Sequence, residues 1–436
     1  MLENIEIVSH SQPKYNIGLV GSVSHGKSMT VKAFTGAQTF KFSKEKEKGI
    51  TMKIGYANCK IFCCQKCPEP ICYQSSNNKT KNHKCIHCNT DCLLKQYFSF
   101  IDCPGHESLM NIMLSGATVM DYAFLLIDAT QKCPQPQTIE HLNALEILQI
   151  KKIIIIQNKL DLVEAMQATE QYASIKNFVK GTIAESAPII PFCAEKKYNL
   201  DILCEFIIKF FGNPQKTITY PKMNIIRSFD VNKPGCTDID KIVGGVLGGS
   251  IISGTLSIGD QVEIRPGLVH LTENTDCNSN FKSNSNSNSK SKSQLVWKPI
   301  FTTIVSMKSD TDDISVATSG GLIGLCTNLD PYLTRSDRMI GQVIGLPGHM
   351  PDVYTECRAK CIFMSGTHLP KSNSEVLLNI SSKPIIAIVK KVVKLDYLFT
   401  LKYPCCMSIG ENFSISSKIN GSWKLIGIGS LHLSTK

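Results

Sequence analysis

The sequence contains no uninterrupted apolar run of about 18 residues, the length that a membrane-spanning helix requires. We therefore expect no membrane span and no membrane partner. The first residues, Met1 to Asn4, also lack the basic and apolar regions of a secretory signal peptide. Without such a signal, the 19 cysteines are interpreted as reduced thiols of a cytoplasmic protein, some of them in a metal site, rather than as disulfides.

Acidic residues are outnumbered by basic ones, 36 against 47, which gives a formal net charge of +11. This excess favours a polyanionic partner such as RNA, although solubility alone would also explain it. At 436 residues the chain is too long for one hydrophobic core, so two to three domains are expected.

The first 215 residues or so alternate short apolar runs with amphipathic stretches. Runs that are apolar on both faces predict strands buried in a parallel sheet, and apolar residues three or four positions apart predict helices. The predicted strands are Tyr15–Val20, Tyr97–Ile101, Tyr122–Ile127, Lys152–Gln157 and Ala187–Phe192, and the predicted helices include Glu140–Leu148 and Asp201–Phe211. The alternation predicts an α/β domain over residues 1–215, with a mostly parallel sheet and helices on both faces.

After Asn213-Pro214 the pattern changes to short β-prone runs with glycine turns. These runs are Ile225–Val231, Lys241–Leu247, Thr255–Ile264, Thr302–Met307 and Gly321–Cys326. They predict an antiparallel β-barrel over residues 216–350, and a second β-rich block predicts another over 351–436. The segment 272–294 is rich in serine, asparagine and lysine and is expected to be a disordered loop within the first barrel.

A phosphate-binding loop is the clearest motif. Gly21 opens a Gly-x4-Gly-Lys-Ser pattern that ends at Gly26-Lys27-Ser28, between an apolar strand and a stretch that can begin a helix. Backbone N–H groups in such a loop point at phosphate oxygens, and the helix N-terminus adds its positive end. Lys27 is expected to reach the β- and γ-phosphates, and the Ser28 hydroxyl to coordinate Mg²⁺.

Two further segments suit the phosphate side of such a site. Asp102-Cys103-Pro104-Gly105-His106 follows the predicted strand at Tyr97–Ile101, where the Asp102 carboxylate can hold magnesium through water. Gly105 lets the loop bring its N–H to the γ-phosphate, and His106 is then next to an attacking water. Thr51 is a candidate for the threonine that binds magnesium and γ-phosphate only in the triphosphate state.

The base is predicted to be guanine. Asn158-Lys159-Leu160-Asp161 follows a predicted strand at the carboxyl edge of the sheet. The Asp161 carboxylate can accept two hydrogen bonds from guanine, whereas adenine would leave it unpaired. Cys193-Ala194 follows the next strand, where a backbone N–H can meet guanine O6. The predicted nucleotide-binding residues are Gly21, Ser24, His25, Gly26, Lys27, Ser28, Met29, Asp102, Gly105, Asn158, Lys159, Leu160, Asp161, Cys193, Ala194 and Glu195, with His106, Lys27 and Thr51 as catalytic residues and Ser28, Thr51 and Asp102 at Mg²⁺.

Longer segments are similar to one family of translational GTPases. The chain resembles the gamma subunits of translation initiation factor 2, relatives of elongation factor Tu, in its segments 49–58, 132–142, 227–236 and 338–343. The last 85 residues or so match more weakly, although Trp423-Lys424-Leu425-Ile426-Gly427 resembles the family's closing strand.

This resemblance implies a P-loop GTPase domain followed by two β-barrels. It implies a Mg²⁺-dependent GTPase that delivers methionyl initiator tRNA to the small ribosomal subunit within a heterotrimer with alpha and beta subunits. Hydrolysis, stimulated by an activating protein and followed by nucleotide exchange through another factor, releases the tRNA. The chain departs from the family at Ser22, Ser24 and Cys193, where His, Ala and Ser are usual, and slow hydrolysis is expected for the isolated chain.

Two Cys-x-x-Cys pairs, Cys64 with Cys67 and Cys85 with Cys88, interrupt the α/β domain. Two such pairs can hold one Zn²⁺ through four thiolates and stabilise a loop with little core of its own, and the resemblance implies a zinc-ribbon-like knuckle at about residues 63–95. The competing ligands are Cys63, Cys72, Cys92, His83 and His87, and a loop of metal-free thiols is the alternative.

Two other functions remain open from the sequence. An elongation-type factor for a special aminoacyl-tRNA, such as selenocysteinyl-tRNA, would carry the same nucleotide site and fold. A scaffold that binds GTP without hydrolysing it is disfavoured, because Lys27, Ser28, Thr51, Asp102 and His106 are all present.

Overall fold

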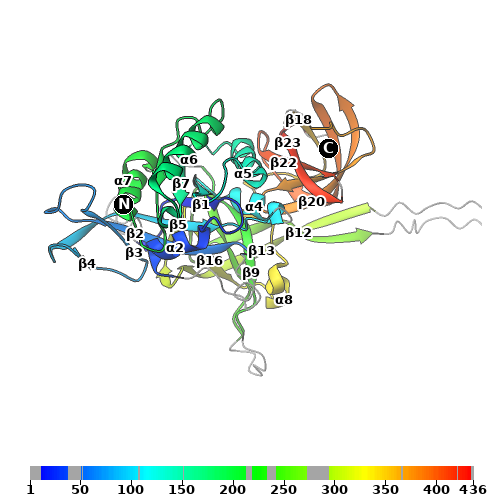
Figure 1. Cartoon of the computed structure of the whole chain (residues 1–436). Coiled ribbons are helices and arrows are strands. Elements are labelled where there is room, and N and C mark those ends of the chain that lie inside the picture. The colour runs from blue at the N-terminus through cyan, green and yellow to red at the C-terminus, as the bar shows by residue number, and fades with distance from the viewer. Residues whose placement is uncertain are drawn as a thin grey trace, which may run out of the picture.

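The computed structural model describes residues 11–37, 51, 53–106, 109–150, 152–212, 219–232, 242–272, 294–364, 367–419 and 421–433 (Figure 1). The charge run at 44–48, the segment 49–50 and the interior of the 272–294 segment therefore lie outside the described residues. No helix among the described residues is long and apolar enough to span a membrane.

The N-terminal domain is built on one twisted sheet with strand order β3-β2-β5-β1-β6-β7-β8, with β4 paired to β5. Strands β5, β1, β6, β7 and β8 run parallel, while β2, β3 and β4 are antiparallel additions. The strands are β1 (Asn16–Val20), β2 (Gly55–Cys63), β3 (Tyr73–Asn77), β4 (His83–Lys84), β5 (Asp91–Asp102), β6 (Tyr122–Asp128), β7 (Ile153–Asn158) and β8 (Ile189–Pro191). The five predicted strands are all present, and β5 begins earlier than predicted.

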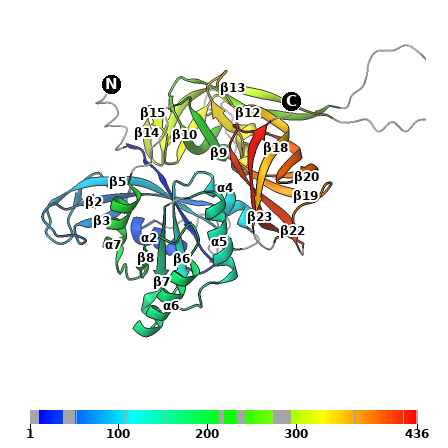
Figure 2. The same cartoon turned by 90° about the horizontal axis from the view of Figure 1, so that it is seen from above.

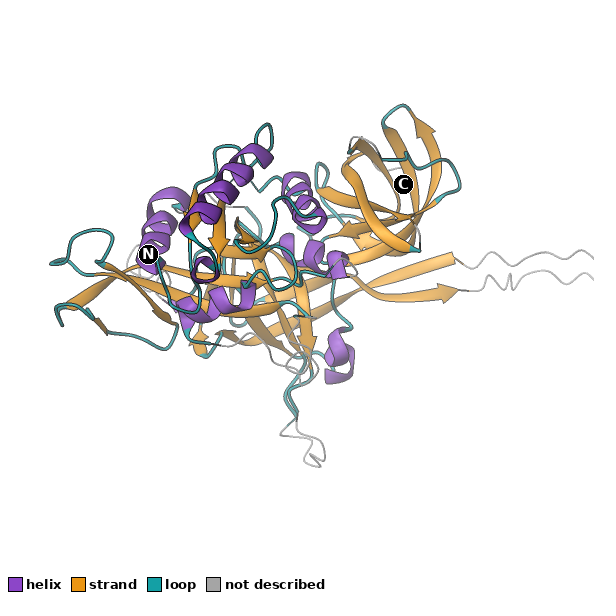
Figure 3. Cartoon of the chain, viewed as in Figure 1, coloured by secondary structure: helices purple, strands orange, loops and turns teal. Residues whose placement is uncertain are grey.

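Helices cover both faces of this sheet, as Figure 3 shows in purple. They are α2 (Lys27–Thr35), α4 (Met110–Ala117), α5 (Pro136–Ile147), α6 (Ala165–Phe178) and α7 (Leu200–Phe206). The two faces carry separate buried clusters, one around Phe34 and Phe124 and the other around Met113 and Leu145. Strand β7 is buried along its whole length, as an apolar run within a parallel sheet requires.

The helix predicted over residues 201–211 is shorter than expected. The α-helix ends at Phe206, and Ile207–Phe211 form a π-helical turn. The carbonyl oxygens at this end are taken by tertiary partners, because Lys152 Nζ donates to Phe210 O at 2.9 Å and Tyr122 donates its hydroxyl hydrogen to Phe211 O at 3.0 Å.

The second domain is a closed β-barrel. Six strands pair in the order β12-β17-β9-β10-β16-β13, and the pairing of β12 with β13 closes the ring. The strands are β9 (Lys222–Phe229), β10 (Val246–Ser253), β12 (Gln261–Thr272), β13 (Gln294–Ser309), β16 (Ile323–Thr327) and β17 (Val343–Gly345), with β11 (Thr255–Ser257), β14 (Asp312–Ile314), β15 (Val316–Thr318) and the short helix α8 (Pro331–Thr334) attached. The strand predicted at 241–247 was wrong in its position, because β10 runs on through Gly248 and Gly249 with a register shift between them.

The third domain is a second closed barrel, in the order β18-β21-β20-β19-β22-β23. Its strands are β18 (Val353–Phe363), β19 (Glu375–Ile380), β20 (Lys383–Val393), β21 (Asp396–Cys406), β22 (Asn412–Ile419) and β23 (Ser422–Leu433). Its interior is one apolar cluster that includes Phe399 and Phe413. Together the three domains confirm the predicted fold class.

Both barrels lie against the N-terminal domain (Figure 2). The third domain contacts helices α4 and α5, where Asn379 Nδ2 donates to Asn111 O at 3.2 Å. The second domain lies beside the edge that carries β2, and there Asn78 Nδ2 donates to Asp310 Oδ2 at 2.7 Å. This hydrogen bond joins the sheet's antiparallel edge to the second domain.

Candidate functional site

The phosphate-binding loop connects β1 to α2. Gly26 is the residue before the helix and has a left-handed backbone with φ of 91°. A Cβ on Gly26 would lie 2.2 Å from Asn158 Nδ2, so no larger residue fits there. Gly36 has φ of 70° and ends the helix, as predicted from the sequence.

Lys27 is buried beneath this loop. Its ammonium group donates to Gly21 O at 2.7 Å and to Ser22 O at 2.8 Å. Burial lowers the pKa of Lys27 to about 8, although the nearby Asp102 carboxylate opposes that shift. A buried ammonium group beneath a loop of backbone N–H groups is suited to binding an anionic ligand.

Three predicted magnesium ligands meet at the start of α2. Ser28 donates its hydroxyl hydrogen to Asp102 Oδ2 at 2.6 Å, and its oxygen lies 3.2 Å from Thr51 Oγ1. Asp102 and Thr51 are both buried. Hydroxyl and carboxylate oxygens are the ligands that Mg²⁺ prefers, so this donor set fits that ion.

The turn after β5 lies directly on the phosphate loop. A Cβ on Gly105 would come within 2.4 Å of Lys27 Nζ and 2.6 Å of Gly21 O, which only glycine avoids. His106 follows on the exposed side of this turn. The structure thus places the Asp102–His106 segment beside the phosphate loop.

The segment predicted to recognise the base lies at the ends of β7 and β8. Asn158 joins three segments, because its amide donates to His25 O at 2.9 Å and its Oδ1 accepts from Ala194 N at 3.2 Å. Lys159 has a left-handed backbone and leaves the strand sharply, and Leu160 N donates to Phe192 O at 3.4 Å. Cys193 donates its thiol hydrogen to Asp161 Oδ1 at 3.2 Å.

Some predicted nucleotide-binding residues have other side-chain contacts. The His25 ring is buried, with Nδ1 2.8 Å from Leu126 O and Nε2 3.2 Å from Gln131 Oε1, so its side chain braces the loop. Met29 and Glu195 are exposed at the rim of the site, and Ser24 is exposed with a left-handed backbone.

Two contributors were missed in the sequence. Asp128 ends β6 and accepts from Lys159 Nζ at 2.7 Å. Burial opposes its ionisation, but the hydrogen bonds from Lys159 and Thr130 outweigh burial and hold the pKa of Asp128 below its ordinary value. Asp128 could have been found in the sequence, because it is a carboxylate that directly follows an apolar run predicted to end at the same sheet edge as Asn158. His141 on α5 is buried beside the Gly105 backbone, and burial first, then Lys27, lowers its pKa to about 3, although the Gly105 backbone opposes that shift.

The four predicted zinc-binding cysteines form one cluster. Cys64 lies 3.4 Å from Cys88, and Cys67 lies 3.6 Å from both Cys85 and Cys88, measured between sulfur atoms. Tetrahedral Zn–S bonds of about 2.3 Å would place the sulfur atoms roughly 3.8 Å apart, close to these distances. Among the described residues, the five competing ligands do not join this cluster.

The environment of Cys85 favours the thiolate. Burial would raise its pKa, but N–H groups of His87 and Cys88 and the amide of Gln74 outweigh that and lower the pKa of Cys85 to about 5. The thiolate is the form that binds metal. The four sulfur atoms, which lie within 4.8 Å of one another, form a candidate metal site.

Comparisons with known proteins identify the family of the chain. The model of the elongation factor Tu GTP binding domain matches residues 12–213, and that of initiation factor eIF2 gamma, C terminal, matches residues 364–431. The chain is 43% identical to eukaryotic translation initiation factor 2 subunit gamma of Schizosaccharomyces pombe, over 98% of this chain and 97% of that protein. It is 42% identical to eukaryotic translation initiation factor 2 subunit 3 of Drosophila melanogaster, over 98% of this chain and 90% of that protein.

The chain belongs to the gamma-subunit family of translation initiation factor 2. This gamma-subunit homologue is a translational GTPase, and its GTPase domain implies binding of GTP or GDP with Mg²⁺. Solved structures share its fold. A bacterial selenocysteine-specific elongation factor superposes with a TM-score of 0.70 at 18% identity, covering 96% of this chain and 58% of that one. Elongation factor SelB of Methanococcus maripaludis in complex with a GTP analogue superposes with a TM-score of 0.69 at 18% identity. The match covers 98% of this chain and 80% of that one.

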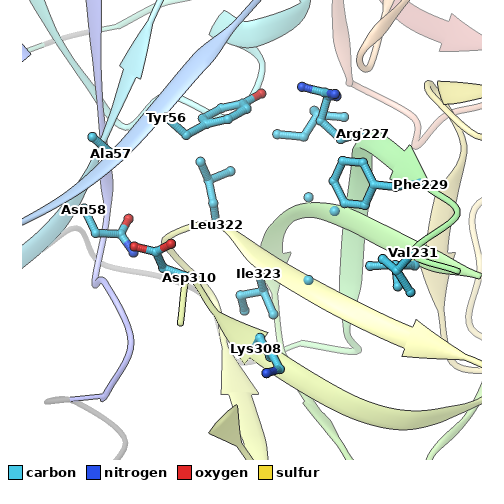
Figure 4. Close-up of a pocket in the computed structure, with 15 residues that line it drawn as sticks. Tyr56, Ala57, Asn58, Arg227, Phe229, Val231, Lys308, Asp310, Leu322 and Ile323 are labelled. Carbon is cyan, nitrogen blue, oxygen red and sulfur yellow. The ribbon is translucent and has the colours of Figure 1, made fainter. Parts of the chain in front are cut away.

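The gamma-subunit homologue also has a pocket of about 320 Å³ between its GTPase domain and its second domain. Tyr56 on β2 forms one wall, and Arg227 and Phe229 on β9 form another (Figure 4). The Arg227 guanidinium group lies over the Phe229 ring, 5.4 Å from its centroid. The Tyr56 hydroxyl points toward Arg227 and is buried without a hydrogen-bond partner among the described residues.

Proposed function

We propose that the chain carries methionyl initiator tRNA to the small ribosomal subunit in a GTP-dependent manner, with GTP hydrolysis as the release switch. In this proposal it acts in the cytoplasm as the core subunit of a heterotrimer with alpha and beta subunits, together with GTPase-activating and nucleotide-exchange factors. The names of its relatives, subunit gamma and subunit 3 of initiation factor 2, support this assembly.

The interdomain pocket is the observation that carries the proposal. Its volume of about 320 Å³ falls in the range of pockets for small organic groups. Tyr56 and Phe229 offer aromatic faces for a base or an apolar amino-acid side chain, and Arg227 offers a cation for phosphate or ester oxygen. An aminoacylated tRNA end combines these chemical groups. The net charge of +11 supports an RNA partner, since phosphate neutralisation supplies much of such affinity.

We assign the nucleotide contacts from the same geometry. Lys27 binds the β- and γ-phosphates, and Ser28, Thr51 and Asp102, the last through water, surround Mg²⁺. The backbone N–H of Gly105 meets the γ-phosphate. The contacts among Ser28, Thr51 and Asp102 support this assignment, because they already bring the required oxygen atoms together.

Two further assignments concern the base and the chemistry. Asp161 accepts from the ring N–H and the amino group of guanine, and the Cys193-Ala194 backbone faces guanine O6. His106 orients the attacking water, a role that its place immediately after Gly105 supports. These roles need no side-chain rearrangement of Asn158, which already ties the base segment to the phosphate loop.

We also propose that Cys64, Cys67, Cys85 and Cys88 hold a structural Zn²⁺. The strands β3 and β4 are short and bury few apolar side chains. A metal that links the β2–β3 connection, which carries Cys64 and Cys67, to the β4–β5 connection, which carries Cys85 and Cys88, would supply the stability that this small core lacks.

Filter binding of aminoacylated tRNAs tests the proposed function. In the presence of a non-hydrolysable GTP analogue, the chain should bind methionyl initiator tRNA more tightly than elongator tRNAs, and GDP should weaken that binding. Tyr56→Ala should weaken it by about 10- to 100-fold because a stacking surface is lost, whereas Tyr56→Phe should retain most of the affinity. Equal affinity for initiator and elongator tRNAs would instead favour an elongation-type factor.

A further inference from the structure

Asp337 joins the GTPase domain to the interdomain pocket. Its Oδ1 accepts from Arg227 Nε at 3.0 Å and from Ser228 N at 3.0 Å. Its Oδ2 lies 3.5 Å from Nζ of Lys53, a residue of the GTPase domain. One carboxylate therefore contacts a pocket residue with one oxygen and a GTPase-domain cation with the other.

The backbone around Asp337 is unusual. Ser336 and Asp337 both have left-handed conformations, with φ of 57° and 62°. Residues other than glycine adopt this region at an energetic cost, so the surrounding contacts have to hold them there. The side chain of Asp337 is 18% exposed and that of Arg227 is 23% exposed, so this ion pair is partly shielded from water.

Lys53 is two positions from Thr51, whose hydroxyl contacts Ser28 at the proposed magnesium site. Two contacts are therefore present together in this structure: Lys53 with Asp337, and Thr51 with Ser28. A change in the position of Thr51 would also move Lys53, because only one residue separates them.

We propose that Asp337 is a positioning residue through which the nucleotide state controls Arg227 in the pocket. A free carboxylate binds a guanidinium group in a bidentate manner, with both of its oxygens. While Lys53 occupies Oδ2, Arg227 is held through Nε alone, and its terminal nitrogens remain available to the pocket. When Lys53 withdraws, Arg227 pairs with both oxygens and turns away from the bound group. This inference rests on the proposed function, because it assigns a control to the same pocket.

Three variants of the full chain test the two arms of this contact. Lys53→Gln removes the ammonium group from an exposed position, so folding is not at risk, and it should lower the affinity for methionyl initiator tRNA by about two- to fivefold with a GTP analogue. Affinity with GDP should not change. Lys53→Arg keeps the charge and should behave as the wild type. Asp337→Asn should weaken binding about tenfold with the GTP analogue and remove most of the difference between the two nucleotides.

The matched control is Glu356→Gln, which removes the exposed ion pair with Lys390 in the third domain and should leave both affinities unchanged. If Lys53→Gln lowers the GTP-state and GDP-state affinities equally, or lowers neither, the coupling is overturned.

Hydrogen exchange separates this inference from the proposed function, because it requires no tRNA. Amides of β9 and of Arg335–Asp337 should exchange more slowly with the GTP analogue than with GDP in the wild type, and Lys53→Gln should abolish that difference. A wild-type chain that shows the exchange difference but binds no tRNA would overturn the proposed function while retaining the coupling. A chain that binds tRNA without any such difference would overturn the coupling alone.

Discussion

The thiol of Cys193 lies 3.2 Å from Asp161 Oδ1, so the loop after β8 holds the carboxylate that is proposed to recognise guanine. Burial raises the pKa of Cys193, and the thiol therefore keeps the hydrogen that it donates. Lys196 Nζ approaches the other oxygen at 3.8 Å but is mostly exposed, so the thiol is the better-shielded partner.

Removing this donor should loosen guanine nucleotides. We expect Cys193→Ala to accelerate GDP dissociation by about two- to tenfold, since a hydrogen bond of this kind contributes about 0.5–1.5 kcal/mol. Cys193→Ser keeps a donor and should dissociate GDP no faster than the wild type. Stopped-flow measurements with a fluorescent GDP analogue would check both, and equal rates for the Ala and Ser variants would contradict the role of the hydrogen bond.

Replacing His106 with alanine should affect hydrolysis far more than binding. Positioning of a reacting water contributes about 100-fold or more to rate, whereas an exposed side chain contributes little to nucleotide affinity. Single-turnover hydrolysis with the activating partner should fall by about 100-fold, and GTP affinity by less than about threefold. His432→Ala, at an exposed position of β23, is the control. Parallel losses of affinity and rate would refute the assignment.

Nucleotide binding should depend on pH through Lys27. Its pKa is about 8 in the nucleotide-free chain, and bound phosphates favour the charged form, so binding takes up a proton above that pH. Affinity should therefore be constant below pH 8 and fall as the pH rises further. Calorimetry of GDP binding in buffers of different ionisation enthalpy should show little proton uptake at pH 7 and a fraction approaching one at pH 9. Lys32→Met on the same helix should retain this profile, and absence of uptake at pH 9 would contradict it.

The same shift has an opposite effect on the free energy of unfolding. The unfolded chain binds more protons than the folded chain between pH 8 and the ordinary lysine pKa of 10.5. Stability of the nucleotide-free chain therefore gains a contribution from Lys27 as the pH rises through this window, and lacks it below pH 8.

Metal analysis should find one zinc ion per chain. Cys85→Ser should remove it and make residues 63–95 easier to cleave by protease, because the loop then has only its small core. Cys72→Ser lies outside the four-cysteine cluster and should retain the metal. Protein purified without chelators that contains no zinc, or a Cys72→Ser variant that loses it, would rule out this ligand set.

Much of the fold could be predicted because its signals are local. The apolar run 153–156 marks a buried parallel strand, and Gly36 marks the end of a helix. The course of β10 could not be predicted, because it continues through Gly248 and Gly249, where its pairing with β9 shifts register. The end of α7 could not be predicted either, because tertiary partners take the Phe210 and Phe211 carbonyl oxygens beyond it. Strands β3 and β4 lacked an apolar pattern of their own.

The sequence alone determined the kind of nucleotide site, since those residue types at those spacings suit little else, but it left five other cysteines and histidines in competition with Cys64, Cys67, Cys85 and Cys88. Only the tertiary structure decided how distant segments meet: Thr51 beside Ser28, Lys159 on Asp128, and Asp337 between Lys53 and Arg227. These contacts join residues far apart in the chain, and their geometry follows from the order of strands in the sheet and from the packing of the domains. Neither can be derived from the spacing of residues within a short segment.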